Sequence, residues 1–338
     1  MNEMKNELLL SVSMITFKHE LYIKQAIEGV LMQETNFEFH LIIADDCSPD
    51  ATPQIVKDII DNHPNGYRVK YFRHEKNMGM QTNGSFALQQ CKGKYVAVCE
   101  GDDYWIDPLK LQKQVDILEN NPEYKFCITN LDFYNQSTSK FDRSILNTFK
   151  KPLYLDIEDF LVKKAFMAPC TWLGTRECFF LTNINDIQSD GSFAIFMDVL
   201  QNTKVYFLDD TTSVYRILQE SASHSNSFLK MLNYNQGIYR TQLHYIEKYN
   251  LSRLKNIVYE SYRDSIKLML RKNYQNIELS KAIKLIQDDF KSDDIIILVQ
   301  ELIYYYQKEL LKINNSKSLR IVKLVTAPLV YIKNKFNV

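Results

Sequence analysis

The 338-residue sequence lacks the patterns of several common enzyme classes. It has neither a P-loop nor a G-x-G-x-x-G fingerprint, which argues against a kinase and a dinucleotide dehydrogenase. Its six cysteines show no C-x-x-C spacing, so neither a zinc site nor a disulfide framework is indicated, and its six histidines form no H-E-x-x-H motif. Basic and acidic residues balance at 41 each, so no net field points to nucleic acid as a partner.

Long apolar segments are also absent. No run approaches the ~20 residues that span a bilayer, and Met1–Glu7 is polar, without the apolar core of a signal peptide. We therefore expect a cytoplasmic protein whose cysteines are reduced and buried.

The last stretch, 312–338, is basic and amphipathic. It carries six lysine or arginine side chains and no acidic one, interleaved with aliphatic residues. Two interpretations stay open, namely peripheral contact with an anionic membrane surface and a terminal helix docked on its own domain. Pro328 interrupts the helix in either case.

Strand and helix patterns alternate over residues 8–120, which predicts an α/β fold with a doubly wound, mostly parallel sheet. Continuous apolar stretches predict the strands, and apolar residues at i, i+3 and i+4 predict the helices. In this part we expect strands at 8–15, 37–44, 69–72 and 95–99, and helices at 23–31, 55–60, 83–90 and 109–119. After residue 120 we expect strands at 125–134, 170–175, 205–208 and 213–217, and helices at 154–162 and 193–201.

Beyond residue 228 the pattern becomes helical throughout. We therefore predict a first domain at 1–227 and a helical C-terminal region at 228–338 that includes the basic tail, and this region would offer a surface for homodimer formation. The helices expected there are 234–249, 254–270, 279–290 and 295–313.

Two acidic turns follow predicted strands. Glu100, Asp102 and Asp103 come directly after the 95–99 strand, and Asp45 and Asp46 follow the 37–44 strand. Ligands of open α/β sheets bind at the carboxyl ends of the strands, and gathered carboxylates favour a hard cation shared with substrate phosphates. The plain alternative is a solvated acidic turn that only caps the next helix.

The order of these motifs is identified as that of a known family. The chain resembles family 2 glycosyltransferases with the GT-A fold, a Rossmann-like sheet flanked by helices, and in particular the bacterial enzymes that build surface polysaccharides. The resemblance covers about the first 220 positions. It is carried by 11–17 with Glu20, 43–52, 73–77 with Gly79 and Asn83, 93–95, 100–105 and 107–114.

The resemblance implies a metal-dependent inverting transferase. It would move a sugar from a nucleotide diphosphate donor, with a UDP-sugar favoured, to a hydroxyl of a glycan or lipid-linked acceptor, and the cofactor would be Mn²⁺ or Mg²⁺. By the same resemblance Thr16, Phe17 and Glu20 line the nucleotide pocket, Asp46 with Asp45 hydrogen-bonds the base, Asn77, Gly79 and Asn83 lie along the ribose and diphosphate, and Asp102 and Asp103 form the DXD-type motif, with Asp103 as the metal ligand.

The sequence departs from the family pattern at two places. The acidic residue expected as catalytic base falls on Ser192, and Asp190 lies two residues earlier, where it would act as the base or only cap a helix. The metal-binding histidine expected after Tyr215-Arg216-Ile217 is Leu218, with His224 as the nearest substitute. These departures favour one rival, a catalytically degenerate nucleotide-sugar-binding partner of an active transferase. A third interpretation is a nucleotidyltransferase on a similar sheet, which is weakened because no basic, glycine-rich loop follows the first strand.

Overall fold

The computed structural model describes residues 8–148, 156–163, 167–183, 187, 191–221, 225–272, 279–291, 293–298, 300, 301 and 304. The chain divides into two compact units, Met1–Leu218 and Gln219–Val338. The predictions for Asp190, for His224, for the amino end and for the tail 312–338 fall outside the described residues.

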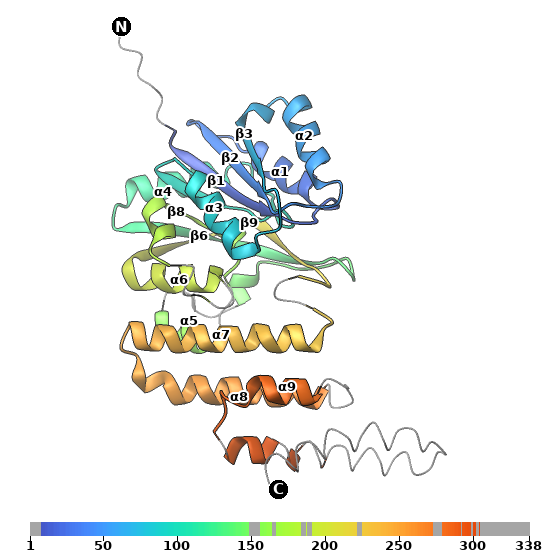
Figure 1. Ribbon diagram of the computed structural model, residues 1–338. Coiled ribbons are helices and arrows are strands. Elements are labelled where there is room, and N and C mark those ends of the chain that lie inside the picture. Colours follow the sequence, from blue (N-terminus) through green and yellow to red (C-terminus); the bar gives the residue numbers. More distant parts are fainter. Residues whose placement is uncertain are drawn as a thin grey trace. The chain divides into compact units, whose positions relative to one another are not determined.

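In the described part of the first unit, nine strands form one sheet in the order β3-β2-β1-β4-β8-β6-β9-β5, with β7 paired to β6 (Figure 1). The first four strands are parallel, as the alternating pattern predicted. The other half is mixed, because β8 runs antiparallel to β4 and β6 while β9 runs parallel to β6. The strands are β1 (Leu10–Thr16), β2 (Phe39–Asp45), β3 (Val69–Arg73), β4 (Tyr95–Val98), β5 (Tyr104–Trp105), β6 (Tyr124–Asn135), β7 (Lys140–Asp142), β8 (Leu173–Thr175) and β9 (Lys204–Ile217).

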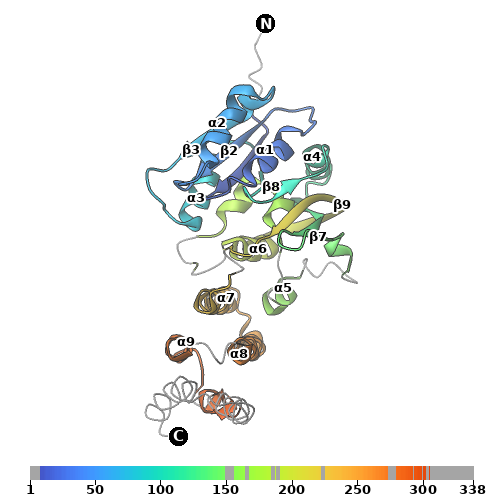
Figure 2. The ribbon, with the colours of Figure 1, turned by 90° about the vertical axis from the view of Figure 1, so that its right-hand side faces the viewer.

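The helices of this unit cover both faces of the sheet (Figure 2). The connections from β1 to β2 and from β2 to β3 run one way along the sheet, whereas the connection from β3 to β4 runs back. Right-handed crossovers therefore place α1 and α2 on one face and α3 on the other. The bounds are α1 (Ile23–Leu31), α2 (Thr52–Asn62), α3 (Met80–Gln90), α4 (Lys110–Asn120), α5 (Ile157–Lys163) and α6 (Gly191–Asn202).

Helix α1 packs its predicted apolar stripe into the core beneath the parallel strands, and Ile23, Ala26 and Ile27 are fully buried there. Gly29 lets the short strand β5 lie directly on this helix, because a Cβ atom at that position would stand 2.9 Å from the backbone nitrogen and oxygen of Trp105. The same contact fixes the segment that follows the Glu100–Asp103 turn.

Several expected boundaries were wrong for local reasons. The strands predicted at 205–208 and 213–217 are one strand, β9, because the polar residues between them form a bulge opposite Thr129 and Asn130 of β6. Helix α4 begins at Lys110, since Asp107 Oδ1 first accepts the amide hydrogen of Leu109 at 2.9 Å. The stretch expected to be extended at 170–175 starts instead with the short 3₁₀ helix Pro169–Thr171.

The second unit is helical, as predicted, with α7 (Phe228–Lys248), α8 (Lys255–Lys272) and α9 (Leu279–Ile286). Helices α7 and α8 pack through the stacked rings of Tyr239 and Tyr262, whose centroids lie 4.1 Å apart. Tyr262 also donates a hydrogen bond to Asp289 at 3.3 Å. Among the described residues, no helix combines the length and the apolar character needed to cross a membrane.

Candidate active site at the carboxyl edge of the sheet

The loops that follow β1, β2, β3 and β4 meet at the carboxyl edge of the parallel strands. Strand β1 stands between the two acidic turns and joins them through its backbone. The carbonyl of Thr16 accepts the amide hydrogen of Asp46 at 3.0 Å, and the carbonyl of Ile15 accepts that of Gly101 at 3.0 Å. The structure therefore brings the two acidic turns to neighbouring positions, as the sequence predicted.

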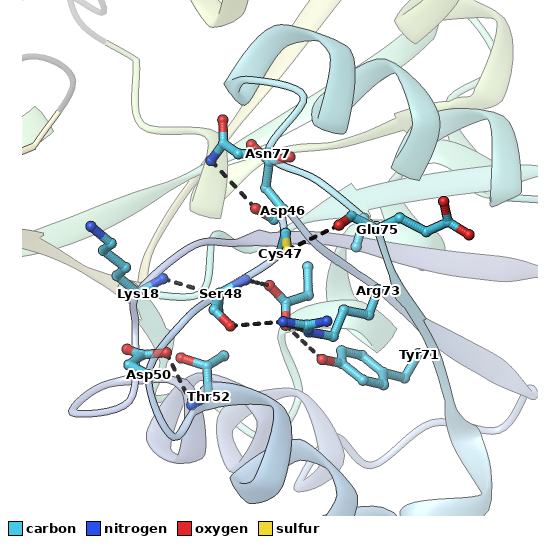
Figure 3. A network of polar contacts seen from close by, with 12 residues as sticks. Lys18, Asp46, Cys47, Ser48, Asp50, Thr52, Tyr71, Arg73, Glu75 and Asn77 are labelled. Atoms are coloured by element: carbon cyan, nitrogen blue, oxygen red, sulfur yellow. Dashed lines mark hydrogen bonds and ion pairs between the residues drawn. The ribbon is translucent and has the colours of Figure 1, made fainter.

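Asp45 is fully buried, and both of its carboxylate oxygens have partners within the chain. Oδ1 accepts the Ser48 amide hydrogen at 2.8 Å, and Oδ2 accepts the Tyr71 hydroxyl at 2.6 Å with Arg73 Nε at 3.8 Å (Figure 3). Burial, and then the hydrogen bond to this charge, raises the pKa of Tyr71 above its usual range. These contacts give Asp45 a structural role in holding the turn.

Asp46 binds the loop that follows β3. Its carboxylate accepts the amide hydrogens of Met78 at 2.6 Å and Gly79 at 2.9 Å, and the Asn77 side chain donates to its carbonyl at 3.3 Å (Figure 3). Gly79 has φ +86°, a conformation that side chains rarely adopt. A glycine is required here because the backbone turns sharply to present its amide to Asp46.

Asn83 fixes the start of α3 against β2. Its side-chain nitrogen donates to the carbonyl of Ala44 at 2.9 Å, and its oxygen lies 3.0 Å from His74 Nε2. The side chain is 2% exposed. These contacts hold the 74–79 loop beside the sheet edge, where the resemblance expects a ribose and a diphosphate.

The loops after β1 and β2 are joined by reciprocal bonds. Glu20 Oε2 accepts the amide hydrogen of Ala51 at 2.9 Å, and the amide of Glu20 donates to Asp50 Oδ2 at 3.1 Å. Phe17 is half-buried next to them. Lys18 and Cys47 hold φ angles of 60° and 62°, which are unusual for residues with side chains, and such strain is concentrated at functional sites.

Asp103 differs from the other carboxylates at this edge. The side chain is 1% exposed, Oδ1 accepts the backbone amide hydrogen of Arg216 at 2.8 Å, and Oδ2 has no hydrogen-bond partner among the described residues. Burial, followed by the neighbouring charges of Asp102 and Glu100, raises its pKa well above the usual range. A buried carboxylate oxygen that the described residues leave unpaired, on a group with this pKa, is one that a cation or a proton can satisfy.

Arg216 links β9 to the Glu100–Asp103 turn, a role that was not predicted from the sequence. Its Nε donates to the carbonyl of Asp102 at 2.7 Å, and its terminal nitrogens donate to Gln25 and Gln136 at 2.8 Å. The guanidinium also lies against three tyrosine rings at 4.9, 5.0 and 5.8 Å, those of Tyr22, Tyr104 and Tyr134 respectively. An arginine near the end of the predicted 213–217 strand was the sequence signal for this contact.

The acidic turn suits a divalent cation that takes its other ligands from a substrate. Within the described ranges, no group of three or more His, Cys, Asp or Glu side chains is arranged to hold a metal on its own. Magnesium-type sites commonly use one or two carboxylates together with substrate phosphates. Asp103 Oδ2 and the Asp102 carboxylate match that donor set.

A largely apolar pocket adjoins the turn at Glu100. It runs between α3 and the start of α6, where Ser192 lies. Leu218, at the place where the resemblance expects a histidine, directly follows β9 in the sequence. Its lining is formed by Ser13, Ile15, Met80, Gln81, Gly84, Leu88, Val98, Glu100, Pro169, Trp172, Phe179, Gly191, Ser192 and Ile195.

Several known proteins are similar in sequence to part of this chain. An uncharacterized protein of Mycobacterium tuberculosis is 42% identical over 118 residues, or 35% of this chain and 34% of that protein. The chain thus spans about a third of the length of the mycobacterial relatives it matches. The putative teichuronic acid biosynthesis glycosyltransferase TuaG of Bacillus subtilis is 26% identical over 218 residues, 64% of this chain and 81% of TuaG.

Solved structures show the same fold at low identity. S. aureus TarS 1–349 in complex with UDP-GlcNAc has a TM-score of 0.57 and 15% identity, covering 98% of this chain and 92% of that one. The mannosyltransferase PcManGT from Pyrobaculum calidifontis, in complex with GDP-Man and Mn²⁺, has a TM-score of 0.53 and 12% identity, covering 98% and 88%. Residues 11–179 match the family described as glycosyl transferase family 2. The chain therefore has the GT-A fold and belongs to glycosyl transferase family 2.

Proposed function

We propose that this protein is a metal-dependent inverting glycosyltransferase of polysaccharide synthesis. It would transfer a sugar from a nucleotide diphosphate donor, with UDP-sugars favoured, to a hydroxyl group of a glycan or lipid-linked acceptor. The observation that carries the proposal is the buried Asp103 Oδ2, which has no partner among the described residues at the edge where α/β sheets bind ligands.

The donor would lie along the loops that the structure brings together. Thr16, Phe17 and Glu20 would line the nucleotide pocket, and Asp46 would accept a hydrogen bond from the base. Asp45 would support Asp46 from behind, since its own oxygens already have partners. Asn77, Gly79 and Asn83 would shape the loop beside the ribose and diphosphate, with Asp102 facing the phosphates.

Asp103 would hold the cation, Mn²⁺ or Mg²⁺, which supplies charge neutralisation for the departing diphosphate. The acceptor oxygen would form its bond to the anomeric carbon on the face opposite the breaking bond to the diphosphate, which inverts the configuration. Its proton would pass to Asp190, which directly precedes α6 in the sequence. General base catalysis of this kind is worth ~10²–10⁴-fold.

A second candidate function is favoured by the two departures from the family pattern. Ser192 stands where a catalytic carboxylate is expected, and Leu218 stands where a histidine is expected. A chain with both losses would bind a nucleotide sugar without turning it over and would act with an active partner subunit.

The test is a calorimetric titration with UDP in Mn²⁺ and in EDTA, followed by a release assay with a panel of UDP- and GDP-sugars and candidate acceptors. The proposal expects UDP binding that depends on Mn²⁺ and release of the nucleotide, with Asp190→Asn about 10²-fold slower or more. Binding without turnover of any donor would support the degenerate partner. Failure to bind UDP, together with no release from any UDP- or GDP-sugar, would contradict both candidate functions.

The cellular location and the domain organisation of the protein belong to the same proposal. We place it in the cytoplasm, at the inner face of the membrane if the basic tail 312–338 binds anionic lipid. The division into a catalytic part, 1–227, and a helical part, 228–338, would leave the helical part free to form a homodimer.

A further inference from the structure

The pocket between α3 and α6 lies next to the place where the donor sugar would be. Glu100 connects it to the acidic turn, and Ser192 connects it to the start of α6. Because the sugar of a nucleotide sugar is bonded directly to the diphosphate, a group on that sugar can reach a pocket that adjoins this turn. Most of the lining is nevertheless aliphatic or aromatic, which is unusual for a surface that would meet a carbohydrate.

Gly84 leaves one wall of this pocket open. It lies in the interior of α3, where glycine weakens a helix relative to alanine. A Cβ atom at this position would have no neighbouring heavy atom within 4 Å, and the backbone of Gly84 does not have a positive φ. Neither packing nor conformation therefore requires glycine here. The absent side chain leaves space in the pocket for a ligand.

Trp172 contributes a buried hydrogen-bond donor to the same lining. Its side chain is 1% exposed, its ring stacks on Phe196 with the centroids 5.7 Å apart, and its Nε1 has no hydrogen-bond partner among the described residues. The other tryptophan of the chain, Trp105, donates its indole hydrogen to the carbonyl of Cys170 at 2.8 Å, as buried tryptophans usually do. A ligand held against Trp172 can supply the acceptor that this indole lacks.

The lining limits the chemistry of the group that enters the pocket. A hydroxyl group would lose its hydrogen bonds to water among largely apolar side chains, which costs affinity. A methyl group alone would suit these side chains but would leave Trp172 Nε1 without an acceptor. An acetamido group has both parts, because its methyl group suits the apolar walls and its carbonyl oxygen accepts a hydrogen bond.

We propose that the pocket binds the N-acetyl group of the transferred sugar, so that the donor is a nucleotide diphosphate acetamido sugar. The proposal rests on the proposed function. The acetamido group would be on the carbon next to the anomeric carbon, which keeps it close to the diphosphate and to the turn at Glu100. Its methyl group lies beside Gly84, and its carbonyl oxygen accepts the indole hydrogen of Trp172.

The test compares sugars that differ only in this group. Calorimetry on the full-length protein in Mn²⁺ would use UDP-N-acetylglucosamine against UDP-glucose, and UDP-N-acetylgalactosamine against UDP-galactose, with UDP alone as the reference. We expect the acetamido sugar of at least one pair to bind about tenfold or more tightly than its hydroxyl counterpart, since even one methylene in an apolar pocket changes discrimination by that much.

Two variants change the pocket without removing a charge. Gly84→Leu should bring the affinity ratio of the pair close to one and leave the affinity for UDP unchanged, and it should fold because leucine favours a helix. Trp172→Phe keeps an aromatic ring and removes the donor, so the ratio should fall about threefold or more. The matched control is Thr82→Leu, which adds a leucine at an exposed position of the same helix and should leave the ratio unchanged.

Equal affinities within both pairs, or a ratio that neither Gly84→Leu nor Trp172→Phe reduces, would overturn this inference while Mn²⁺-dependent UDP binding still supports the proposed function. If Gly84→Leu slowed turnover without changing the ratio, the pocket would belong to the acceptor and the inference would again be wrong. Failure of the native protein to bind UDP or any of the four sugars would count against both.

Discussion

The two acidic turns at the sheet edge have the same Asp-Asp sequence and opposite environments. In the turn after β2, every carboxylate oxygen of Asp45 and Asp46 accepts a hydrogen bond from the chain. In the turn after β4, Asp103 keeps one buried oxygen without a partner among the described residues, and its pKa is raised. The first turn holds the loops together, whereas the second contains a buried carboxylate oxygen that a ligand can bind.

The difference shows that the number of carboxylates in a motif does not identify the one that binds. The hydrogen-bond partners of each carboxylate decide whether it can bind a ligand, and these partners come from other helices, strands and loops. Tyr71 of β3 and the 78–79 amides satisfy the first turn, whereas β9 brings a single backbone amide to Asp103.

The largest effect is expected from Asp103→Asn. Removing the charge should weaken Mn²⁺-dependent UDP binding about 100-fold or more, since even changes to residues behind metal ligands cost 10–100-fold. The metal-free variant should also melt a few degrees higher, because a buried, unpartnered charge costs about 1–3 kcal/mol or more. Calorimetry and thermal melting in EDTA measure the two effects. If UDP binding by Asp103→Asn kept the same dependence on Mn²⁺, the two turns would not differ in their role in cation binding.

Arg216→Lys tests the support of the second turn. Lysine cannot reproduce the contacts to the Asp102 carbonyl, to Gln25 and to Gln136, nor the contact with the tyrosine rings. We expect the free energy of unfolding to fall by about 2–3 kcal/mol, and Mn²⁺-dependent UDP affinity to fall about tenfold.

Its matched control is Arg73→Lys at the first turn. Arg73 is 42% exposed and 3.8 Å from Asp45, so this change should cost less than about 1 kcal/mol. If urea titrations showed the same loss of unfolding free energy in Arg216→Lys and Arg73→Lys, the proposed difference between the two turns would be wrong.

Tyr71→Phe removes a partner of Asp45 without altering a charge. The loss of a hydrogen bond to a charged group should cost about 1.5–3 kcal/mol of unfolding free energy, while UDP affinity changes less than about twofold. Because the pKa of Tyr71 is raised in the folded state, the native advantage should hold below pH ~10 and shrink above it, where the unfolded phenol ionises first. Urea unfolding between pH 7 and 11 measures this trend, and a large loss of UDP affinity would assign Asp45 a direct binding role.

Asp46→Asn tests the loop that the first turn holds. The amide keeps one acceptor but turns a donor toward the Met78 or Gly79 amide, which loosens the 77–79 loop. We expect UDP to bind about tenfold more weakly, or about 1.4 kcal/mol, by the same factor in Mn²⁺ and in EDTA. A loss confined to Mn²⁺ would instead connect this turn to the cation.

Much of the fold was predictable because its signals are local. Strands β1 to β4 are continuous apolar segments, and their predicted bounds differ from the observed ones by no more than two residues. Strand β9 was predicted as two pieces because Asp209 and Asp210 interrupt its apolar pattern, and only the pairing with β6 shows that they belong to a bulge.

The site was predictable only in part, for a different reason. The motif residues at the strand ends could be placed from the sequence, since strand ends in a parallel sheet meet at one edge. The contacts of Tyr71 and Arg216 could not, because they join segments that are 26 and 114 residues apart. Hydrogen bonding in three dimensions, rather than any local pattern, decides which carboxylates remain available.

The bulge in β9 also determines the face of the sheet to which each later side chain of the strand points. Successive residues of a strand point to opposite faces, so deleting one bulge residue would rotate the end of β9 by half a repeat. Ile217 would then stand where Arg216 does, and the guanidinium would turn away from Gln25 and the tyrosine rings. A length change in the bulge, more than 100 residues along the chain from the acidic turn, would in this way remove the contacts of Arg216 with that turn while leaving every motif in the sequence intact.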